Sequence, residues 1–398
     1  MKILLNDGLA EEGVKILLEE GLEVSKERLD SSALAKYIQN VDALIVRSAT
    51  KVTREIIKNG AQGNLKIIGR AGVGYDNIDI EAATENGIVV KFAPYGNTNS
   101  AAELALGLMI ATSRNIPQAH TSAISGIWQR QPFFGIEITG KTLGIIGCGR
   151  VGQRLSELVT GFHMDVIGYD SSIEHVKLHF PTSKIRYSSL EEVLTKSHYI
   201  SLHTGGSKTL IGERELSMMR KDAILINTSR GSNVNENALY TALKNGTIKS
   251  AGLDVYEEEP DIEGTEFKNK LRELKNVVLS MHLGASTEEA QKETAREIAT
   301  VVSDYLKKGD FSNSVNAGET IGYEKKQIHP LFIYHKDLPG AFAAIDRVLA
   351  DYGVNIREIS SRQLGNGSAM AVYSVHQPIT EEVINSLQNL DLVLSTKI

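Results

Sequence analysis

The stretch KTLGIIGCGRVGQRLSEL, residues 141–158, carries three glycines between a short apolar run and a segment with helical spacing. The pattern Gly147-x-Gly149-x-x-Gly152 is typical of the strand–turn–helix unit that binds the pyrophosphate of a dinucleotide, although such triplets also occur by chance. Two surrounding features favour the dinucleotide. The glycines directly follow an apolar strand, and Asp170 ends the next expected strand about twenty residues later. The stretch therefore predicts a nucleotide-binding α/β fold.

Each residue of this turn has a physical task. Gly147 permits the tight turn, Gly149 lets the backbone approach the phosphates, and Gly152 lets the helix pack closely on the strand. We expect the amides of Arg150 and Val151 to face the phosphates at the positive end of the helix.

Asp170 bears on which dinucleotide is bound. Its carboxylate is expected to accept hydrogen bonds from the adenosine ribose hydroxyls and to repel a 2′-phosphate. The following Ser171 and Ser172 supply no arginine that would compensate for this repulsion. The sequence therefore predicts NAD rather than NADP.

Length and composition limit the class of protein. A chain of 398 residues predicts two or three domains, and a formal net charge of −6 argues against a nucleic-acid surface. The single cysteine, Cys148, excludes an intrachain disulfide, fits a reducing compartment, and is interpreted as a small filler of the turn. The start MKILLNDGL is typical of a strand rather than a signal peptide, and the longest apolar stretch, 104–111, is too short to span a membrane. We therefore expect a cytoplasmic protein.

Short apolar runs alternate with helical spacing along most of the chain, which predicts two doubly wound layers with parallel sheets. Between the layers, residues 98–124 are expected to be helical, with N-cap oxygens from Asn97, Thr98 and Ser100. Residues 286–307 are expected to form one long helix that leads back to the first layer. The expected strands are 2–6, 43–47, 66–70 and 88–92 in the first layer, and 143–147, 165–170, 199–203, 223–227, 250–255 and 276–280 in the second.

The C-terminal part has a different order of elements. A polar, weakly periodic segment at 310–326 contains the best linker, placed at 316–327. Residues 328–398 then run strand, helix, strand, strand, helix, strand, which is the ferredoxin-like βαββαβ plan. We expect a small separate domain there.

Three further stretches follow expected strands of the second layer, namely NTSRG (227–231), GLDVYEEEP (252–260) and SMHLGAST (280–287). Open α/β sheets bind their ligands at the carboxyl ends of the strands, so these stretches bring Arg230, a glutamate and His282 into one crevice. Taken singly, each side chain also has a structural explanation, as a surface ion pair, a solvated acidic run or a loop histidine.

Together with the glycine turn, these stretches make residues 1–315 resemble the D-isomer-specific 2-hydroxyacid dehydrogenases. The resemblance implies two Rossmann-like domains, with a substrate-binding domain at 1–97 and 286–315 and an NAD-binding domain at 98–285. It rests on the ordered blocks GRAGVGYDNID (69–79), GNTNSAAELALGL (96–108), INTSRGSNVNENAL (226–239), GLDVYEEEP (252–260) and HLGASTEEAQ (282–291).

The resemblance also implies catalytic roles. His282 would be the acid/base that removes the hydroxyl proton while hydride leaves C2 for the nicotinamide. Glu259 directly precedes the proline, which selects it over Glu257 and Glu258, and it would hold the imidazole and raise its pKa. Arg230 would bind the substrate carboxylate and polarise the developing carbonyl.

Further cofactor contacts follow from the same resemblance. The chain departs from the family pattern at Met281, where proline is usual, so the loop before His282 is expected to be less stiff. The segment GGSKT (205–209) is also shorter than the usual loop. The implied contacts are His203, Thr204, Thr228, Ser229, Arg230, Asp254, His282, Gly284 and Ala285.

The implied substrate contacts are Arg47, Ser48, Arg70, Val73, Gly74, Asn97 and Arg130. The turn amides at Val73 and Gly74 suit a carboxylate. A simple hydroxy acid needs only this carboxylate site, whereas a phosphorylated substrate needs further cations. Arg47, Arg70 and Arg130 could supply these cations, and the alternative is that they are surface arginines. In this family, equivalent positions serve 3-phosphoglycerate.

The stretch HKDLPGAFAAIDRVLADYGVNI (335–356) resembles the start of an ACT domain, an amino-acid-sensing module. Behind such a dehydrogenase it implies L-serine as an effector, bound by His335, Asp337 and Asn355. Asp337 stands where serine-sensitive members carry asparagine, and its carboxylate would repel that of serine. An ACT domain that only dimerises therefore remains an alternative.

The expected function is NAD-dependent oxidation of 3-phosphoglycerate to 3-phosphohydroxypyruvate, the first step of L-serine biosynthesis, by a homodimer or homotetramer. Two alternatives stay open. One is a hydroxypyruvate, glyoxylate or D-lactate reductase of the same family, and the other is an NADH-sensing corepressor on this fold. No metal, nucleic acid or membrane partner is expected.

Overall fold

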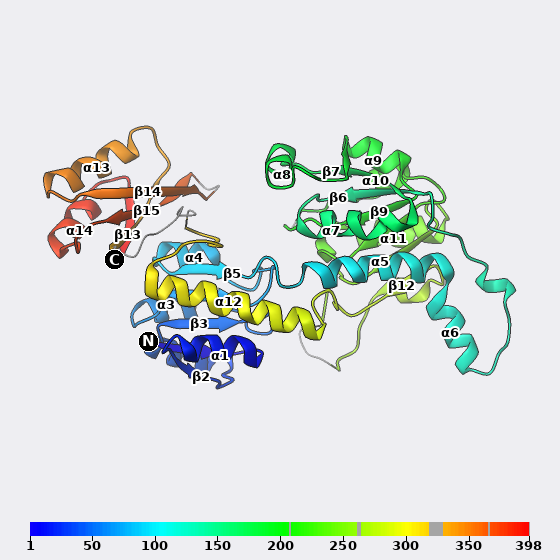
Figure 1. The fold of residues 1–398 in the computed structure, drawn as a ribbon, viewed down its shortest axis with the longest axis horizontal. Helices are drawn as coiled ribbons and strands as arrows, with labels where there is room; N and C mark the ends of the chain where they lie inside the picture. The colour runs from blue at the N-terminus through cyan, green and yellow to red at the C-terminus, as the bar shows by residue number, and fades with distance from the viewer. Residues whose placement is uncertain (207, 261–263, 318–328, 365–366, 398) are drawn as a thin grey trace. The chain divides into compact units, whose positions relative to one another are not determined.

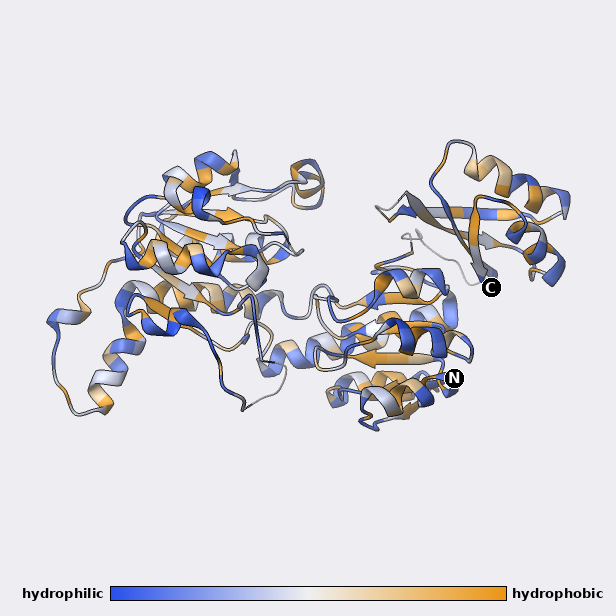
Figure 2. Cartoon of the chain, turned by 180° about the vertical axis from the view of Figure 1, so that it is seen from behind, coloured by the Kyte–Doolittle hydropathy of each residue, from blue (hydrophilic) through white to orange (hydrophobic). Residues whose placement is uncertain are grey.

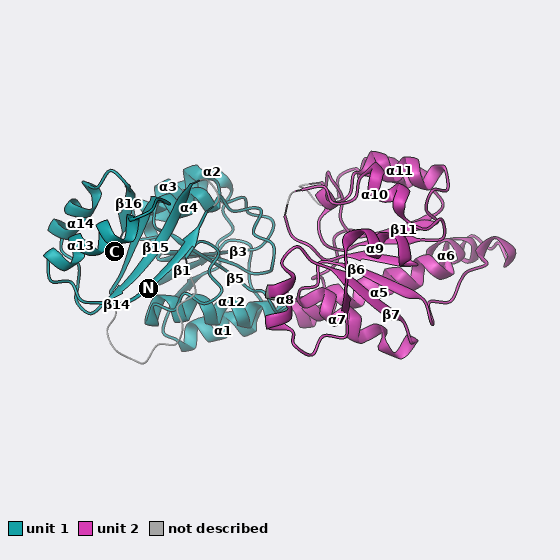
Figure 3. Cartoon of the chain, turned by 90° about the horizontal axis from the view of Figure 1, so that it is seen from above, with its two compact units in different colours: residues 1–96, 291–398 teal, residues 97–290 magenta. Residues whose placement is uncertain are grey.

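The computed structural model describes residues 1–206, 208–260, 264–317, 329–364 and 367–397. The chain divides into two compact units, residues 1–96 with 291–398 and residues 97–290 (Figure 3). The linker expected at 316–327 lies outside the described residues except for its first two positions.

The first unit begins with a five-stranded parallel sheet in the order β2-β1-β3-β4-β5 (Figure 1). Its central strands are buried on both faces, which explains their continuous apolar runs. Helix α12 (Glu288–Lys308) packs on one face through Ile298 and Val302. The strands are β1 (Lys2–Leu5), β2 (Glu23–Ser25), β3 (Ala43–Val46), β4 (Ile67–Arg70) and β5 (Val89–Phe92). The other helices are α1 (Glu11–Glu19), α2 (Ser31–Tyr37), η1 (Ile38–Asn40), α3 (Arg54–Ala61) and α4 (Ile80–Glu85).

The C-terminal part of this unit is an antiparallel sheet in the order β14-β15-β13-β16, the ferredoxin-like arrangement. One face is covered by α13 and α14. The other face joins the core around the five-stranded sheet, here called the first lobe, where the rings of Phe311 and Phe332 lie 5.4 Å apart. The sheet expected to stand apart therefore shares a hydrophobic core with its neighbour. Its elements are β13 (His329–Lys336), α13 (Ala341–Asp351), β14 (Ile356–Gln363), β15 (Ser368–Val375), α14 (Glu381–Gln388) and β16 (Val393–Lys397).

The second unit holds a seven-stranded parallel sheet in the order β12-β11-β10-β9-β6-β7-β8. The chain builds outward from β6 to β8, then returns to β9 on the other side of β6, so β6 and β9 are neighbours. This reversal of strand order marks where open α/β sheets bind ligands. The strands are β6 (Thr142–Ile146), β7 (Asp165–Tyr169), β8 (Arg186–Tyr187), β9 (Tyr199–Leu202), β10 (Ile224–Asn227), β11 (Ser250–Leu253) and β12 (Val277–Leu279).

Helices cover both faces of this sheet, with α5 buried against β10, β11 and β12. The strands are hydrophobic, whereas the covering helices carry hydrophilic outer faces (Figure 2). The helices are α5 (Thr98–Arg114), α6 (Ile116–Ile124), η2 (Gln131–Phe133), α7 (Arg150–Leu158), η3 (Val159–Phe162), α8 (Ile173–His179), α9 (Leu190–Lys196), α10 (Glu213–Met218), η4 (Gly231–Asn233), α11 (Glu236–Lys244) and η5 (Lys270–Glu273).

The predicted fold class is confirmed, with two parallel-sheet α/β layers and one ferredoxin-like sheet. The expectation missed β2 and β8, which are edge strands of three and two residues without an apolar run. Among the described residues, no helix combines the length and hydropathy that crossing a membrane requires.

The capping expected before α5 is wrong in detail. Asn97 is the N-cap residue, but its φ of −109° and ψ of 7° depart from the extended conformation that capping needs, and its side chain makes no cap bond. Asn97 Oδ1 and Thr98 Oγ1 are buried, and within the described ranges neither has a hydrogen-bond partner. Ser100 bonds instead to Thr287 Oγ1 at 2.6 Å.

Candidate active site

The loops after β6 and β9 touch at the point where the strand order reverses. Gly147 follows β6 with a φ of +94°, and a Cβ there would lie 2.6 Å from the carbonyl carbon of His203. Only glycine fits this conformation and this close approach. The His203 ring bonds to Ser201 Oγ at 2.9 Å, and burial lowers the pKa of His203 to about 4, so the ring is neutral.

The N-terminus of α7 fits a dinucleotide. Its N-cap, Gly149, supplies no side-chain cap, and a Cβ on this residue would meet no protein atom within 4 Å. A Cβ on Gly152 would instead lie 2.4 Å from the carbonyl oxygen of Gly147, so helix and strand are in close contact there. The start of the helix, at Arg150 and Val151, therefore leaves room beside its backbone for the phosphates that we expect there.

Asp170 is held at the glycine turn by two backbone amides. Its Oδ2 accepts from the Cys148 amide and its Oδ1 from the Ser172 amide, both at 2.8 Å. Each carboxylate oxygen keeps a further lone pair for a ribose hydroxyl. The Cys148 thiol is fully buried, and burial raises its pKa to about 12, so it is an inert filler.

Replacing Asp170 with alanine should lower the preference for NAD over NADP by about 10- to 100-fold. This factor corresponds to the free energy that hydrogen bonds to a charged group contribute. The ratio of kcat/KM for the two cofactors measures this preference. Asp170→Asn is the matched variant, because its amide oxygen still accepts from one backbone amide while the negative charge is lost. An unaltered ratio in both variants would refute the role of the carboxylate in cofactor choice.

A second network ties the loop after β9 to the loop after β10. The Asn233 amide donates to Thr204 Oγ1 at 3.0 Å and to Ser229 Oγ at 2.9 Å. The Asn227 side chain accepts from the Ser229 amide and donates to the Arg230 carbonyl. Thr228 Oγ1 is buried and has no partner in the part of the chain that the structure describes, which suits contact with a bound dinucleotide.

The structure brings His282 and Glu259 together. His282 Nδ1 lies 2.6 Å from Glu259 Oε2, and Glu259 Oε1 accepts from the Tyr256 amide at 3.1 Å. The imidazole is 54% exposed and the carboxylate 34% exposed, so a substrate can reach the ring. Arg230 lies near enough for its charge to act on both groups.

Electrostatics match this pairing. The hydrogen bond to Glu259 raises the pKa of His282 above its ordinary value, against the opposing effects of burial and of the Arg230 charge. Burial would raise the pKa of Glu259, but the hydrogen bond and charge of His282 outweigh it and lower that pKa. The pair is therefore a carboxylate that increases the basicity of an accessible imidazole.

Asp254 holds the loop that carries His282. Its carboxylate is fully buried and accepts from Ser280 Oγ at 2.6 Å, the Leu283 amide at 2.8 Å and the Gly284 amide at 3.0 Å. Its carbonyl accepts from the His282 amide at 2.7 Å. The contact between Asp254 and the cofactor stays a prediction. The structure shows instead that this carboxylate holds the loop, a task that the sequence did not indicate.

The Glu259 carboxylate should control the pH dependence of turnover. In the predicted role of His282 as base, the ring must be neutral for oxidation, so we expect the rate to rise as pH increases through the raised pKa of this ring. Glu259→Gln keeps an acceptor oxygen but removes the charge, so the pKa of His282 falls and the rising limb moves to lower pH. Profiles of kcat/KM against pH in both reaction directions check this. If the rising part of the pH–rate profile stays at the wild-type pH, Glu259 does not control the pKa of His282.

The predicted substrate residues of the first unit lie at the ends of β3 and β4. The Arg47 amide donates to Asp7 Oδ2 at 2.7 Å, and Ser48 is exposed. Arg70 Nη1 donates to the Ala71 carbonyl at 2.7 Å, and its guanidinium lies beside Gly72, directly before Val73 and Gly74. In the second unit, Asn97 precedes α5 and the exposed Arg130 follows α6.

Two of the predicted effector residues, His335 and Asp337, lie at the end of β13, whereas Asn355 lies at the opposite end of the sheet, because Ile356 and His329 both pair with Val375. His335 is 1% exposed, its Nδ1 lies 2.9 Å from the Lys336 carbonyl oxygen, and its ring packs on Phe342 at 5.4 Å. The Asp337 amide donates to the Gly367 carbonyl at 2.9 Å. Asn355 is exposed directly before β14.

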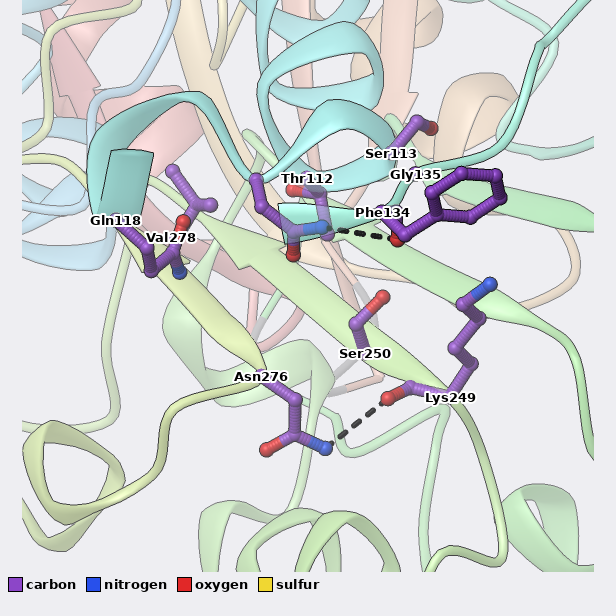
Figure 4. A pocket seen from close by; sticks show the side chains of 10 residues that line it. Thr112, Ser113, Gln118, Phe134, Gly135, Lys249, Ser250, Asn276 and Val278 are labelled. Carbon is purple, nitrogen blue, oxygen red and sulfur yellow. Dashed lines mark hydrogen bonds between the residues drawn. The ribbon is translucent and has the colours of Figure 1, made fainter. Parts of the chain in front are cut away.

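A small cavity of about 80 Å³ lies at the opposite end of the second sheet (Figure 4). Ser250, which begins β11, and Asn276, which precedes β12, line it together with the end of α5. Because parallel strands place the loops of their two ends on opposite edges, this cavity is remote from the edge of the His282–Glu259 pair. It is no candidate for hydride transfer.

Comparison with known proteins gives the same assignment from a separate direction. Residues 106–284 match the NAD-binding domain of D-isomer specific 2-hydroxyacid dehydrogenases, and residues 331–392 match the ACT domain. The chain is 43% identical over 331 residues to D-3-phosphoglycerate dehydrogenase of Methanocaldococcus jannaschii, covering 82% of this chain and 61% of that one. It is 41% identical over 301 residues to hydroxypyruvate reductase of Thermotoga maritima, covering 75% of this chain and 95% of that one.

A solved structure, that of a protein from Thermus thermophilus, matches with a TM-score of 0.69 at 30% identity, over 79% of this chain and 100% of that one. The chain spans only 61% of the length of the archaeal dehydrogenase but nearly all of the shorter reductase. Because the match to the reductase extends over 95% of that protein, and the NAD-binding match encloses the glycine turn, the chain belongs to the D-isomer-specific 2-hydroxyacid dehydrogenase family.

Proposed function

We propose that this protein oxidises 3-phosphoglycerate to 3-phosphohydroxypyruvate with NAD, the first step of L-serine biosynthesis. The observation that carries the proposal is the 2.6 Å bond between His282 and Glu259, on which the charge of Arg230 acts. The 43% identity to an archaeal D-3-phosphoglycerate dehydrogenase and the ACT domain support the choice of substrate.

The proposed mechanism assigns one task to each side chain. NAD, when bound, accepts the hydride that leaves C2 of the hydroxy acid. His282 Nε2 takes the hydroxyl proton, and Glu259 stabilises the imidazolium that results. Arg230 binds the substrate carboxylate through its planar fork and stabilises charge on the oxygen of the new carbonyl.

Substrate recognition is proposed for residues of both units. The amides of Val73 and Gly74 would bind the carboxylate, and Arg47, Arg70 and Arg130 would bind the phosphate group. Three cations around a doubly charged group are more than a lactate or glyoxylate requires. Reduction of hydroxypyruvate remains an alternative function, because the relative from Thermotoga maritima is a hydroxypyruvate reductase.

Absorbance at 340 nm tests the proposal. With NAD, we expect NADH formation from 3-phosphoglycerate to exceed that from D-glycerate or D-lactate. Rapid oxidation of NADH with hydroxypyruvate or glyoxylate, with no turnover of 3-phosphoglycerate or 3-phosphohydroxypyruvate, would establish the reductase instead. Absence of turnover with every hydroxy acid, with NADH still bound, would favour a corepressor.

The ACT domain is proposed to bind an amino-acid effector at His335 and Asp337. The third predicted residue, Asn355, lies at the other end of the sheet, so one chain does not bring it to the other two. L-serine is the first candidate, and its effect is read by adding it to the same assay. The Asp337 carboxylate attracts the ammonium group of such a ligand and repels its carboxylate. The alternative is an ACT domain that only dimerises, and it predicts that L-serine does not change the rate.

We also propose that the protein is a homo-oligomer, a dimer or tetramer, that works in the cytoplasm. Helix α6 and the segment after it extend from the second sheet (Figure 1) and leave Trp128 and Phe134 each 90% exposed. Large aromatic side chains that are this exposed on a projecting segment favour an interface. The buried single cysteine is consistent with a reducing compartment.

A further inference from the structure

Tyr256 contacts all three loops that carry the proposed catalytic residues. Its hydroxyl donates to the Ser280 carbonyl at 2.7 Å, two residues before His282. Its amide donates to Glu259 Oε1 at 3.1 Å. Its carbonyl lies against Gly231, where an added Cβ would fall 1.8 Å from the Tyr256 oxygen, directly after Arg230.

The tyrosine itself is firmly placed. The residue is 5% exposed, and its ring packs on Phe267 with centroids 4.6 Å apart. The loop that follows is held in turn by Glu236, which accepts from the Glu257 amide and the Asn269 side chain, both at 2.7 Å. The packing of the ring and of the following loop therefore fixes the position of the Tyr256 hydroxyl.

The loop that receives this hydroxyl is also held by Asp254, but it lacks the proline that is usual before the histidine. Met281 is 64% exposed and has no ring to restrict its φ, and His282 adopts the left-handed region at a φ of +54°. Bonds on both sides of Met281 fix the peptide planes. The Ser280 carbonyl is held by Tyr256, and the His282 amide by the Asp254 carbonyl.

We propose that Tyr256 is a positioning residue for proton transfer, because its hydroxyl fastens the end of β12 to the β11 loop and thereby keeps the His282 imidazole within hydrogen-bond distance of Glu259. The inference rests on the proposed function for its kinetic consequences, but its structural part concerns the protein without substrate. It assigns a role to the phenol oxygen alone, beyond the apolar contact of the ring.

Tyr256→Phe removes only this oxygen and keeps the ring on Phe267. Misplacement of a catalytic group on the scale of 1 Å lowers turnover strongly, so we expect kcat to fall roughly 10- to 100-fold, with a smaller change in KM. The His282 imidazole should also lose part of its bond to Glu259, so its titration midpoint should shift to lower pH.

Tyr199→Phe is the matched control. Tyr199, the first residue of β9, is fully buried in the same unit, and its hydroxyl lies 2.7 Å from Ser113 Oγ of α5. The start of β9 lies at the edge of the sheet opposite to His282. Both variants lose one buried phenol oxygen, so both should lower the unfolding temperature. Only Tyr256→Phe should change kcat and the histidine titration.

The test uses the full chain with carbon-13-labelled histidine, and NMR follows the His282 ring against pH without substrate. His282→Asn identifies the signal. A lower midpoint in Tyr256→Phe, with the wild-type midpoint in Tyr199→Phe, supports the proposal. An unchanged midpoint together with kcat within twofold of wild type overturns it. If the wild type turns over no hydroxy acid, the proposed function fails, while the titration still decides whether Tyr256 positions the ring.

Discussion

Replacing His282 with asparagine is expected to lower kcat by about two to four orders of magnitude, the usual contribution of a general acid/base. Binding of NADH should persist, because the glycine turn and Asp170 supply the proposed cofactor contacts. Asparagine is preferred to alanine because His282 sits at a φ of +54°, a region that asparagine tolerates well. Steady-state turnover and fluorescence titration of NADH measure the two effects.

His163 provides the control for this substitution. It lies in the same unit at a φ of +53°, so His163→Asn makes the same chemical change in the same backbone conformation. It should leave turnover at the wild-type level. Turnover retained by His282→Asn would refute the acid/base role, and loss of NADH binding in that variant would indicate a role in holding cofactor.

Replacing Arg230 with lysine is expected to lower kcat/KM by about two to three orders of magnitude. Lysine keeps the positive charge but lacks the planar fork that binds a carboxylate through two hydrogen bonds. The loss should appear both in KM for the hydroxy acid and in kcat, because Arg230 also stabilises charge in the transition state. Initial rates over a range of hydroxy-acid concentration separate the two parameters.

Arg220 is the matched control for a forked arginine. It pairs with Asp222 through two hydrogen bonds, of 2.8 and 3.1 Å, on the surface of the same unit. Arg220→Lys should change stability slightly and leave kcat/KM unaffected, since exposed ion pairs contribute little. Equal kinetic effects of the two substitutions would show that the Arg230 result comes from general weakening of the fold.

Much of the fold could be predicted because its signals are local. The apolar runs of β3, β9 and β10 are buried on both faces, and a parallel sheet covered by helices produces this pattern directly. The strands that were missed, β2 and β8, are short edge strands whose existence depends on a neighbour rather than on their own residues.

The candidate site could be predicted only in part. Glu259 was selected from three consecutive glutamates by its place before proline, and the structure puts its carboxylate on His282. The expected caps from Asn97 and Thr98 did not form, because the backbone at Asn97 is not extended. No sequence pattern indicated a role for Tyr256, because a tyrosine after a strand is usually a core residue.

By itself, the sequence determined the α/β class, the place of the cofactor turn, and the types of residue available for proton transfer. These follow from periodicity and from short motifs, which need only neighbouring residues. Only the tertiary structure decided that the C-terminal sheet shares a core with the first lobe, that Asp254 holds the loop of His282, and that the Tyr256 hydroxyl reaches the Ser280 carbonyl. Such contacts join residues far apart along the chain through bonds whose lengths depend on how whole elements pack, and no local pattern carries that information.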